Sequence, residues 1–400
     1  MRLRRSIRWA GQRLSLAGRW CAPALGIFLG VTNAQEQSFI EAINLEAHGF
    51  VSFGYLRTWE NNVYDSDTID GTTEFYEAAL NAIARPWERV RLGAQLFVRD
   101  LGHYDNGRVE LDWAYADFQL HPLCDVQLGR VKIPLGLYNE SQDIDAARSS
   151  VLLAQSLYPT RLRDLQVAVD GGKVSGRAEM GDAGALSYTM FGGTKQFDRD
   201  GAYAAYVGQT SRMTVNEAAV KAVYGGMVQW DTPVPDVALR FTAYQARDIV
   251  IDGVSLFGGQ PVHFVSDSRS LVTSLQWEPR DWTFAAEYLN IATAGESTTG
   301  AVTRPYEFDY NGGYVSATWH VRSWLDGYVA SEYRHSEVAG RPTSFGWSWI
   351  AAINVLPLRN WSLKAEYQYQ DNAVGVLAVE NPQGVSQSWH LFALKTTVDF

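Results

Sequence analysis

The sequence predicts an all-β fold, a transmembrane antiparallel β-barrel of about 16 strands with short periplasmic turns and long extracellular loops. Three features predict it: an export signal at the start of the chain, long segments that alternate apolar and polar residues, and short turns that alternate with longer polar connections. The 400 residues are 46% apolar and 20% charged. This composition excludes a disordered chain and a nucleic-acid-binding protein that relies on basic charge. Since no apolar run reaches about 18 residues, a helical membrane protein is excluded as well.

Residues 1–34 have the layout of a secretory signal peptide. They hold six arginines and no acidic residue, then a short apolar stretch at 20–31, and then Thr32-Asn33-Ala34 before the polar Gln35. We expect cleavage after Ala34, which leaves a single outer-membrane barrel domain at 35–400. Without the six arginines the chain has 28 basic and 44 acidic residues, a net charge of about −16. Cys124 is then its one cysteine, which excludes an intramolecular disulfide.

The most regular alternation runs from Arg89 to Arg99. Apolar residues occupy the even positions from 90 to 98, and Arg91 and Gln95 are among the residues between them. Residues 345–355 and 362–370 repeat this period of two, which indicates strands with one face in an apolar medium and the other in a polar one. Such strands recur to the end of the chain with no amphipathic helix to cover them. The pattern therefore favours a barrel whose outside faces lipid and whose inside faces water.

Turns and polar connections alternate along the chain. The short turns, all but one of which contain proline or glycine, lie at 85–88, 122–125, 181–184, 232–236, 278–281, 321–324 and 356–360. The longer connections lie at 59–72, 101–108, 134–165, 196–215, 250–266, 294–308, 338–344 and 372–386. Seven short and eight long connections join sixteen strands, with both termini on the periplasmic side. The sixth and tenth strands carry the weakest pattern, so fourteen or eighteen strands stay open.

Aromatic residues near strand ends and the last strand point to the bacterial outer membrane. Trp and Tyr at strand ends are typical of an aromatic girdle at the headgroups, although aromatics also pack in any β core. The final strand ends in a terminal aromatic residue and looks like the assembly signal of outer-membrane barrels, with Phe392 and Phe400 as its aromatic residues. We therefore expect the outer membrane of a gram-negative bacterium, with the lipid bilayer, lipopolysaccharide and the outer-membrane assembly machinery as partners.

A stretch before the longest connection carries a family resemblance. Residues 127–140 read Gln-Leu-Gly-Arg-Val-Lys-Ile-Pro-Leu-Gly-Leu-Tyr-Asn-Glu. This segment, continuing to Tyr158-Pro159, resembles gram-negative porins of the phosphate-selective-porin-like superfamily, in which such a strand leads into the third long loop. The resemblance implies a sixteen-stranded, homotrimeric outer-membrane channel. It does not imply a substrate, because the arginine-rich ladder of a phosphate channel is only partly visible.

The loop at 134–165 is the candidate pore constriction. A barrel of about sixteen strands leaves an aqueous lumen, so a selective pore needs a segment that narrows it. This loop is the longest connection, and it starts at Pro134-Leu135-Gly136, where the chain can leave the ladder and turn inward. Its charged residues would face each other across the opening: Asp143, Asp145, Arg148, Arg161, Arg163 and Asp164. The alternative is an outward loop with ordinary solvated charges.

Strand parity predicts a second group of charges on the lumen wall. A charged side chain facing lipid near the midplane costs roughly 2–4 kcal/mol for Arg or Lys, so these residues are expected to point inward. They form a candidate basic track of Arg89, Arg91, Arg99, Arg130 and Lys132. Simple ion pairing along the wall is an equal alternative, with Glu77, Asp117, Glu332 and Glu366 as inward acids.

The sequence thus predicts a porin that allows passive diffusion of small hydrophilic solutes or ions, with anions as candidates, and no enzyme. We expect no cofactor and no metal, because the seven histidines show no metal-ligand spacing. The alternative is a non-channel outer-membrane barrel, an adhesin or a barrel hydrolase. The nearest Ser/His pairs for hydrolysis are Ser331 with His335 and Ser388 with His390.

Overall fold

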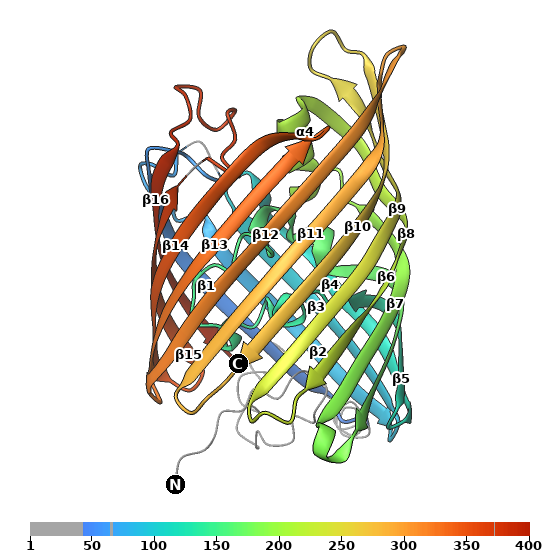
Figure 1. Ribbon diagram of the computed structural model, residues 1–400, viewed down its shortest axis with the longest axis vertical. Coiled ribbons are helices and arrows are strands. Elements are labelled where there is room, and N and C mark those ends of the chain that lie inside the picture. Colours follow the sequence, from blue (N-terminus) through green and yellow to red (C-terminus); the bar gives the residue numbers. More distant parts are fainter. Residues whose placement is uncertain (1–42, 65–66, 372) are drawn as a thin grey trace, which may run out of the picture.

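The computed structural model describes residues 43–64, 67–371 and 373–400, so the predicted signal peptide at 1–34 and its cleavage site lie outside the described residues. These residues form a closed barrel of sixteen antiparallel strands, each paired with its neighbours in chain order. The barrel closes between β1 and β16, from Phe50 opposite Asp399 to Trp59 opposite His390. Figure 1 shows the tilted strands wrapping around a lumen that contains further chain. The predicted fold class and strand number are confirmed, including the sixth and tenth strands.

Strands β8 to β12 are long, with 17–21 residues, whereas β5 has 9 residues (Figure 1). They are β1 (Glu46–Trp59), β2 (Phe75–Trp87), β3 (Val90–Leu101), β4 (Tyr104–His121), β5 (Cys124–Lys132), β6 (Ala168–Glu179), β7 (Ala185–Phe197), β8 (Met213–Asp231), β9 (Val237–Ser255), β10 (Pro261–Trp277), β11 (Trp282–Thr299), β12 (Val302–Arg322), β13 (Leu325–Val338), β14 (Arg341–Leu358), β15 (Trp361–Asp371) and β16 (Ser388–Asp399).

Alternating exposure along the strands matches the two-sided pattern of the sequence. On β14, Trp347, Trp349 and Ile353 are exposed, whereas the alternate residues Ser348 and Ile350 are buried. β15 repeats this arrangement one strand further round. Large apolar side chains thus cover the outside of the barrel, and polar ones point into it. This arrangement suits a barrel with lipid outside and water inside.

All seven short turns lie where they were expected, at the lower end of the barrel in Figure 1, where the C-terminus is also found. The opposite end differs from the expectation. Four connections there are long, at 60–74, 133–167, 198–212 and 372–387, but those expected at 101–108, 250–266, 294–308 and 338–344 are tight turns between extended strands. Their polar residues continue the ladder, because a hairpin beyond the membrane has water on both faces and needs no apolar residues.

Several short helices interrupt the connections. They are η1 (Asn139–Ser141), η2 (Asp145–Ala147), η3 (Thr160–Leu162), α3 (Arg163–Gln166), η4 (Gly181–Ala183) and α4 (Ala202–Ser211). Among the described residues, no helix is both long and apolar enough to span a bilayer.

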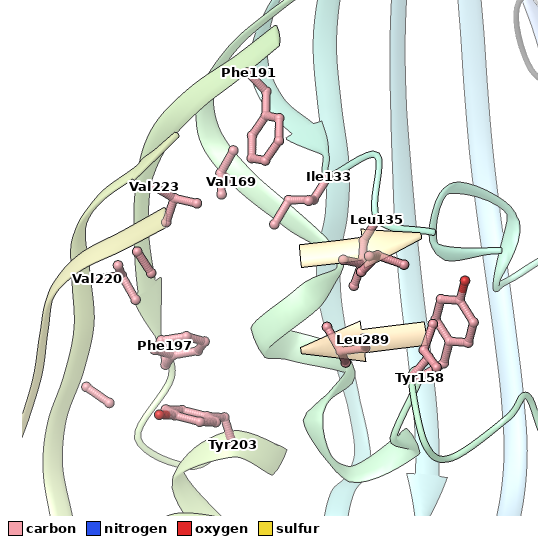
Figure 2. Close-up of a cluster of buried hydrophobic side chains, with 14 of the residues drawn as sticks. Ile133, Leu135, Tyr158, Val169, Phe191, Phe197, Tyr203, Val220, Val223 and Leu289 are labelled. Carbon is pink, nitrogen blue, oxygen red and sulfur yellow. The ribbon is translucent and has the colours of Figure 1, made fainter. Parts of the chain in front are cut away.

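An apolar core lies inside the barrel, between the wall and the segments that fold into the lumen (Figure 2). Ile133 and Leu135, at the start of the connection that follows β5, pack with Phe191 of β7. Lower in the same view, Tyr203 of α4 lies against Phe197, with ring centroids 4.3 Å apart. Burial of these side chains, each worth roughly 1.5–3 kcal/mol, fixes the inner segments against β5–β9.

Candidate functional site

The longest connection, residues 133–167, lies inside the barrel and is called the inner loop below. Asn139 joins its two ends, because its Nδ2 donates to the carbonyl oxygens of Ile133 at 2.8 Å and Gln166 at 2.9 Å. At the loop's start, Thr242 of β9 donates to the Pro134 carbonyl at 2.9 Å. Gly136 follows with φ +55°, a conformation that lets the chain turn away from the wall.

Three wall carboxylates hold the middle of the inner loop by accepting its backbone N–H groups. Glu287 of β11 accepts from Leu137 at 2.7 Å, Glu332 of β13 from Ser156 at 2.8 Å, and Glu366 of β15 from Val151 at 2.7 Å. All three side chains are buried. Hydrogen bonds to charged groups are worth about 1.5–3 kcal/mol each, and these three come from strands far from β5. The loop therefore crosses the lumen and is fixed to the opposite wall.

Asp145 binds the inner loop to β15 and β16. Its carboxylate lies 3.1 Å from the Nζ atoms of both Lys364 and Lys395, and 3.1 Å from a guanidinium nitrogen of Arg148. Thr397 donates a further hydrogen bond to it at 2.8 Å. Burial by itself would raise the pKa of Asp145, but the three cations together hold that pKa below its usual range. The carboxylate is thus a fully ionised anchor.

Asp143 and Arg163 form a second ionic cluster, on the near wall. Arg163 lies 2.7 Å from both Asp143 and Asp112 of β4, and Lys132 lies 2.6 Å from Asp143. Burial acts to raise the pKa of Asp143, while Lys132 and Arg163 lower it below the ordinary range. Gln95 of β3 also donates to Asp143, at 3.1 Å. Asp143 and Asp145 therefore attach neighbouring parts of the inner loop to β3–β5 and to β15–β16.

Arg161 and Asp164 lie nearer the extracellular connections. Arg161 pairs with Glu380 of the 372–387 connection at 3.2 Å and lies over the ring of Tyr64, 5.0 Å from its centroid. Asp164 lies with Asp105 and Glu110, each giving one carboxylate oxygen within 4.8 Å of the others. Burial and Asp105 raise the pKa of Asp164. These residues tie the loop to its neighbours.

A narrow cavity of about 40 Å³ separates the inner loop from the near wall. This volume admits about three water molecules. Its wall side comes from β2, β3 and β16, and its loop side from residues 142–163. The charged residues that line it are Arg99, Arg148, Arg163, Lys395, Glu77 and Asp143. Four bases and two acids line it, and Asp105, Asp112 and Asp145 pair with those bases from outside the cavity. Of the six loop residues expected at a constriction, Asp143, Arg148 and Arg163 line this cavity, while Asp145, Arg161 and Asp164 do not.

The five residues of the expected basic track are not one continuous row. Arg91 pairs with Asp117 at 2.7 Å, Arg99 with Asp105, and Lys132 with Asp143. Those pairs match the alternative of ion pairing along the wall. Arg89 lies in the exposed turn between β2 and β3, away from the lumen wall.

Arg130 differs from its expected orientation. It lies opposite Ala114 and Asp170 in the ladders, and Ala114 borders an outer groove. Its neighbour Val131 instead joins the inner apolar core, so Arg130 itself faces outward, 3.8 Å from Asp170. The expectation rested on the cost of an arginine facing lipid, and Asp170 beside Arg130 supplies a counter-charge that lowers this cost.

Several residues of the site escaped sequence reasoning. Lys364 and Lys395 occupy polar positions in clearly alternating strands, so parity alone could have placed them on the lumen wall. Helix α4 was expected as polar loop, although the run Ala202 to Ala205 favours a helix. It packs beside β8, β4 and the η3–α3 segment and fills part of the lumen (Figure 1).

The Ser/His pairs considered for hydrolysis have other partners. His335 bonds Glu337 at 2.9 Å, and His390 bonds the Tyr367 hydroxyl at 2.6 Å. Both histidines lie at outward positions, since they alternate with the inward residues of β13 and β16.

Comparison with solved structures finds outer-membrane proteins. The chain is similar to in-vitro folded OmpT of Vibrio cholerae in its trimer form, with TM-score 0.55, 13% identity, and 89% of this chain and 99% of that chain covered. It is also similar to the outer-membrane channel DcaP of Acinetobacter baumannii, with TM-score 0.53, 11% identity and coverage of 89% and 97%. A third is an anion-selective porin from Comamonas acidovorans, with TM-score 0.52, 11% identity and coverage of 89% and 99%.

No protein-family model matches the sequence, and no curated protein matches it. At identities of 11–13% the structural likeness shows the fold alone. The chain has the closed sixteen-stranded barrel of bacterial outer-membrane proteins, a group that includes porins.

Proposed function

We propose that this protein is an outer-membrane porin that lets small hydrophilic solutes and ions, anions above all, diffuse passively through a lumen narrowed by the inner loop. The observation that carries the proposal is the loop's attachment to both sides of the barrel, through Asp143 to β3 and β5 on one side and through Glu287 of β11 and Glu332 of β13 on the other. A loop held in this way leaves a narrow passage beside β2 and β3. Solutes there would move in contact with charged side chains.

The charge of that passage favours anions. Arg99, Arg148, Arg163 and Lys395 line it against Glu77 and Asp143. The whole sequence is acidic, with a formal net charge of −10, but charges more than about 10 Å from the path are largely screened at 0.1 M salt. With the direct ion-pair partners counted, Lys132 and Lys364 add two positive charges and Asp105, Asp112 and Asp145 add three negative ones, so an excess of one positive charge remains to set ion preference.

The proposal is tested by the reversal potential of the refolded chain in a planar bilayer under a tenfold KCl gradient. The expected current is ohmic, needs no energy source, and reverses on the side of the chloride equilibrium potential. A correctly folded barrel that carries no current would overturn the channel function. A current that reverses on the potassium side would retain a porin and contradict the basic passage.

The location follows from the same proposal. The chain is exported by the signal peptide at 1–34 and inserted into a gram-negative outer membrane, where it contacts lipid and lipopolysaccharide. Phe400 supports recognition by the assembly machinery, since it ends the closing strand and exchanges two backbone hydrogen bonds of 2.9 Å with Gly49. Phe392 lies on the outward face of that strand, as a lipid-facing signal residue would.

We also propose that three copies associate through the outer face of β2–β5. The outward positions of these strands are mostly alanine and leucine, and they border a groove of about 420 Å³ lined by Ala82, Ala94, Ala116, Leu92 and Leu128, among others. By contrast, β10–β15 expose many tryptophans, as lipid-facing strands do. The outward Arg130–Asp170 pair borders the alanine face, where a neighbouring subunit would spare an arginine the cost of facing lipid.

Placing a large side chain on this face should prevent association. Ala94→Trp is expected to convert the trimer to monomers in sedimentation measurements in detergent, because the indole would fill the groove. Ala351→Trp, on the tryptophan-rich outer face of β14, is the matched control and should remain trimeric. A trimeric Ala94→Trp variant would place the contact elsewhere.

A further inference from the structure

A row of aromatic rings follows the inner face of β12 above the inner loop. Tyr306, Phe308, Tyr310 and Tyr314 occupy alternate positions and therefore share the lumen face. Tyr310 donates to the Ser156 carbonyl of the loop at 2.8 Å, which fixes this face as the inner one. Tyr314 is buried beneath the loop, whereas the upper three rings stay partly exposed.

The residues beside these rings are small. Tyr306 pairs with Gly295 and Phe308 with Thr293 on β11, so the residues opposite these rings on that strand are small. Phe264 of β10 packs edge-on against Tyr306, with centroids 4.8 Å apart and planes at 83°. The rings of Tyr306, Phe308 and Tyr310 thus form an apolar strip on the lumen face of β12, called the strip below.

A guanidinium lies at the foot of the strip. Arg334 of β13 pairs with Gly312, two residues below Tyr310 on the lumen face. Its hydrogen bonds go to Gln370 Oε1 at 2.7 Å, Ser348 Oγ at 3.2 Å and the Val374 carbonyl at 3.3 Å, all of them neutral groups. Among the residues that the structure describes, no carboxylate lies within ion-pair distance of it. Arg334 is therefore a partly exposed cation that makes no direct ion pair among these residues, while Glu332, two residues along the same face of β13, interacts with it electrostatically.

The strip leads to the passage already described. Its lowest ring, Tyr310, contacts Ser156, and the same part of the inner loop supplies Leu153 and Tyr158 to the narrow cavity. The inner loop thus connects the strip on β12 with the passage on the other side of the lumen.

We propose that the channel is selective for small aromatic carboxylates, of which benzoate is the simplest. The ring would stack on Tyr306, Phe308 and Tyr310, and the carboxylate would be drawn to Arg334 and then to Arg148 and Arg163 in the passage. This inference rests on the proposed porin function and deepens it. A neutral solute would gain nothing from the guanidinium, and an inorganic anion nothing from the rings, so a flat anion fits both parts.

The test compares permeability to benzoate with permeability to cyclohexanecarboxylate, which has the same charge and similar size but no aromatic face. Both are measured relative to chloride from bi-ionic reversal potentials of the refolded chain. Wild type is expected to prefer benzoate by about threefold to tenfold, the range that aromatic pairing supports. The double variant Tyr306→Leu/Phe308→Leu should abolish this preference, and Arg334→Gln should lower permeability to both carboxylates relative to chloride.

Tyr288→Leu is the matched control, since this tyrosine on β11 points outward and is half exposed; it should keep the benzoate preference. Equal permeability to the two carboxylates in a chloride-conducting wild type would overturn this inference and leave the porin intact. The same preference in the double variant would overturn the role of the rings. Loss of all current in a folded wild type would instead overturn the porin function itself.

Discussion

Changing Asp145 to Asn should release the inner loop and give a several-fold larger, noisier single-channel conductance. Asp145 compensates Lys364, Lys395 and Arg148, which are otherwise close together and largely buried. Removing one partner of a buried ionic cluster costs roughly 3–5 kcal/mol, because the remaining charges lose their counter-charge. When the inner loop detaches from β15 and β16, water reaches these three cations and the free-energy cost of burying them is relieved. Asp145 does not line the narrow cavity, so the increase would reflect loop position rather than a changed lining.

Asp170→Asn provides the control, because this aspartate lies on the outer face and its loss should leave conductance unchanged. Acid should imitate the Asp145 variant. The pKa of Asp145 is lowered in the folded chain, so its anchor contributes stability above the unfolded-state value of about 3.9 and loses it as pH falls below that value. Wild-type conductance should therefore rise only below about pH 4. If the Asp145→Asn variant had the single-channel conductance of wild type, Asp145 would not be the residue that anchors the inner loop.

Changing Arg148 to Glu should remove the preference for anions. Arg148 lines the passage, and Asp145 keeps its two lysine partners when Arg148 is lost, so the fold should survive. One charge about 6 Å from an ion in water is worth about 0.7 kcal/mol, or about threefold in permeability ratio. Arginine to glutamate changes the charge by two units, so the expected effect on the free energy is twice as large. Arg148→Gln should give about half of the effect on a logarithmic scale. Reversal potentials in a KCl gradient measure both.

The matched control is Arg57→Gln, which removes a positive charge from the outer face of β1, where the guanidinium lies over Trp59. Its reversal potential should equal that of wild type. If Arg148→Glu left the reversal potential unchanged, ions would have to pass somewhere other than the passage beside β2 and β3.

Sequence alternation predicted the barrel well because lipid and water impose the period of two on every strand. The orientation of residues such as Trp347, on the outside of the barrel, and Ser348, on the inside, can be predicted from the alternation alone. The same rule could not recognise polar strands above the membrane, because water surrounds both faces there. It therefore predicted loops at 294–308, where β11 and β12 continue as a hairpin.

The site was predicted only in part because its contacts are long-range. Asp143, Arg148 and Arg163 were expected at a constriction and line the narrow cavity, and Glu332 and Glu366 were expected to face inward. Nothing local to Asp145 indicates that it meets Lys395, which is 250 residues away. Arg130 was placed inward because an arginine facing lipid is costly, although it shares its parity with the exposed Leu128 of the same strand.

Chemical modification at the passage tests the central claim most directly. In a Cys124→Ser background, Gln142→Cys puts a thiol on the loop side of the narrow cavity, and Leu363→Cys puts one on the outer face of β15. A charged methanethiosulfonate added during recording should reduce the current of the Gln142 variant strongly, with recovery after a reducing agent, and should not alter the Leu363 variant. Full labelling of the Gln142 variant with an unchanged current would contradict conduction through the passage between the inner loop and the near wall.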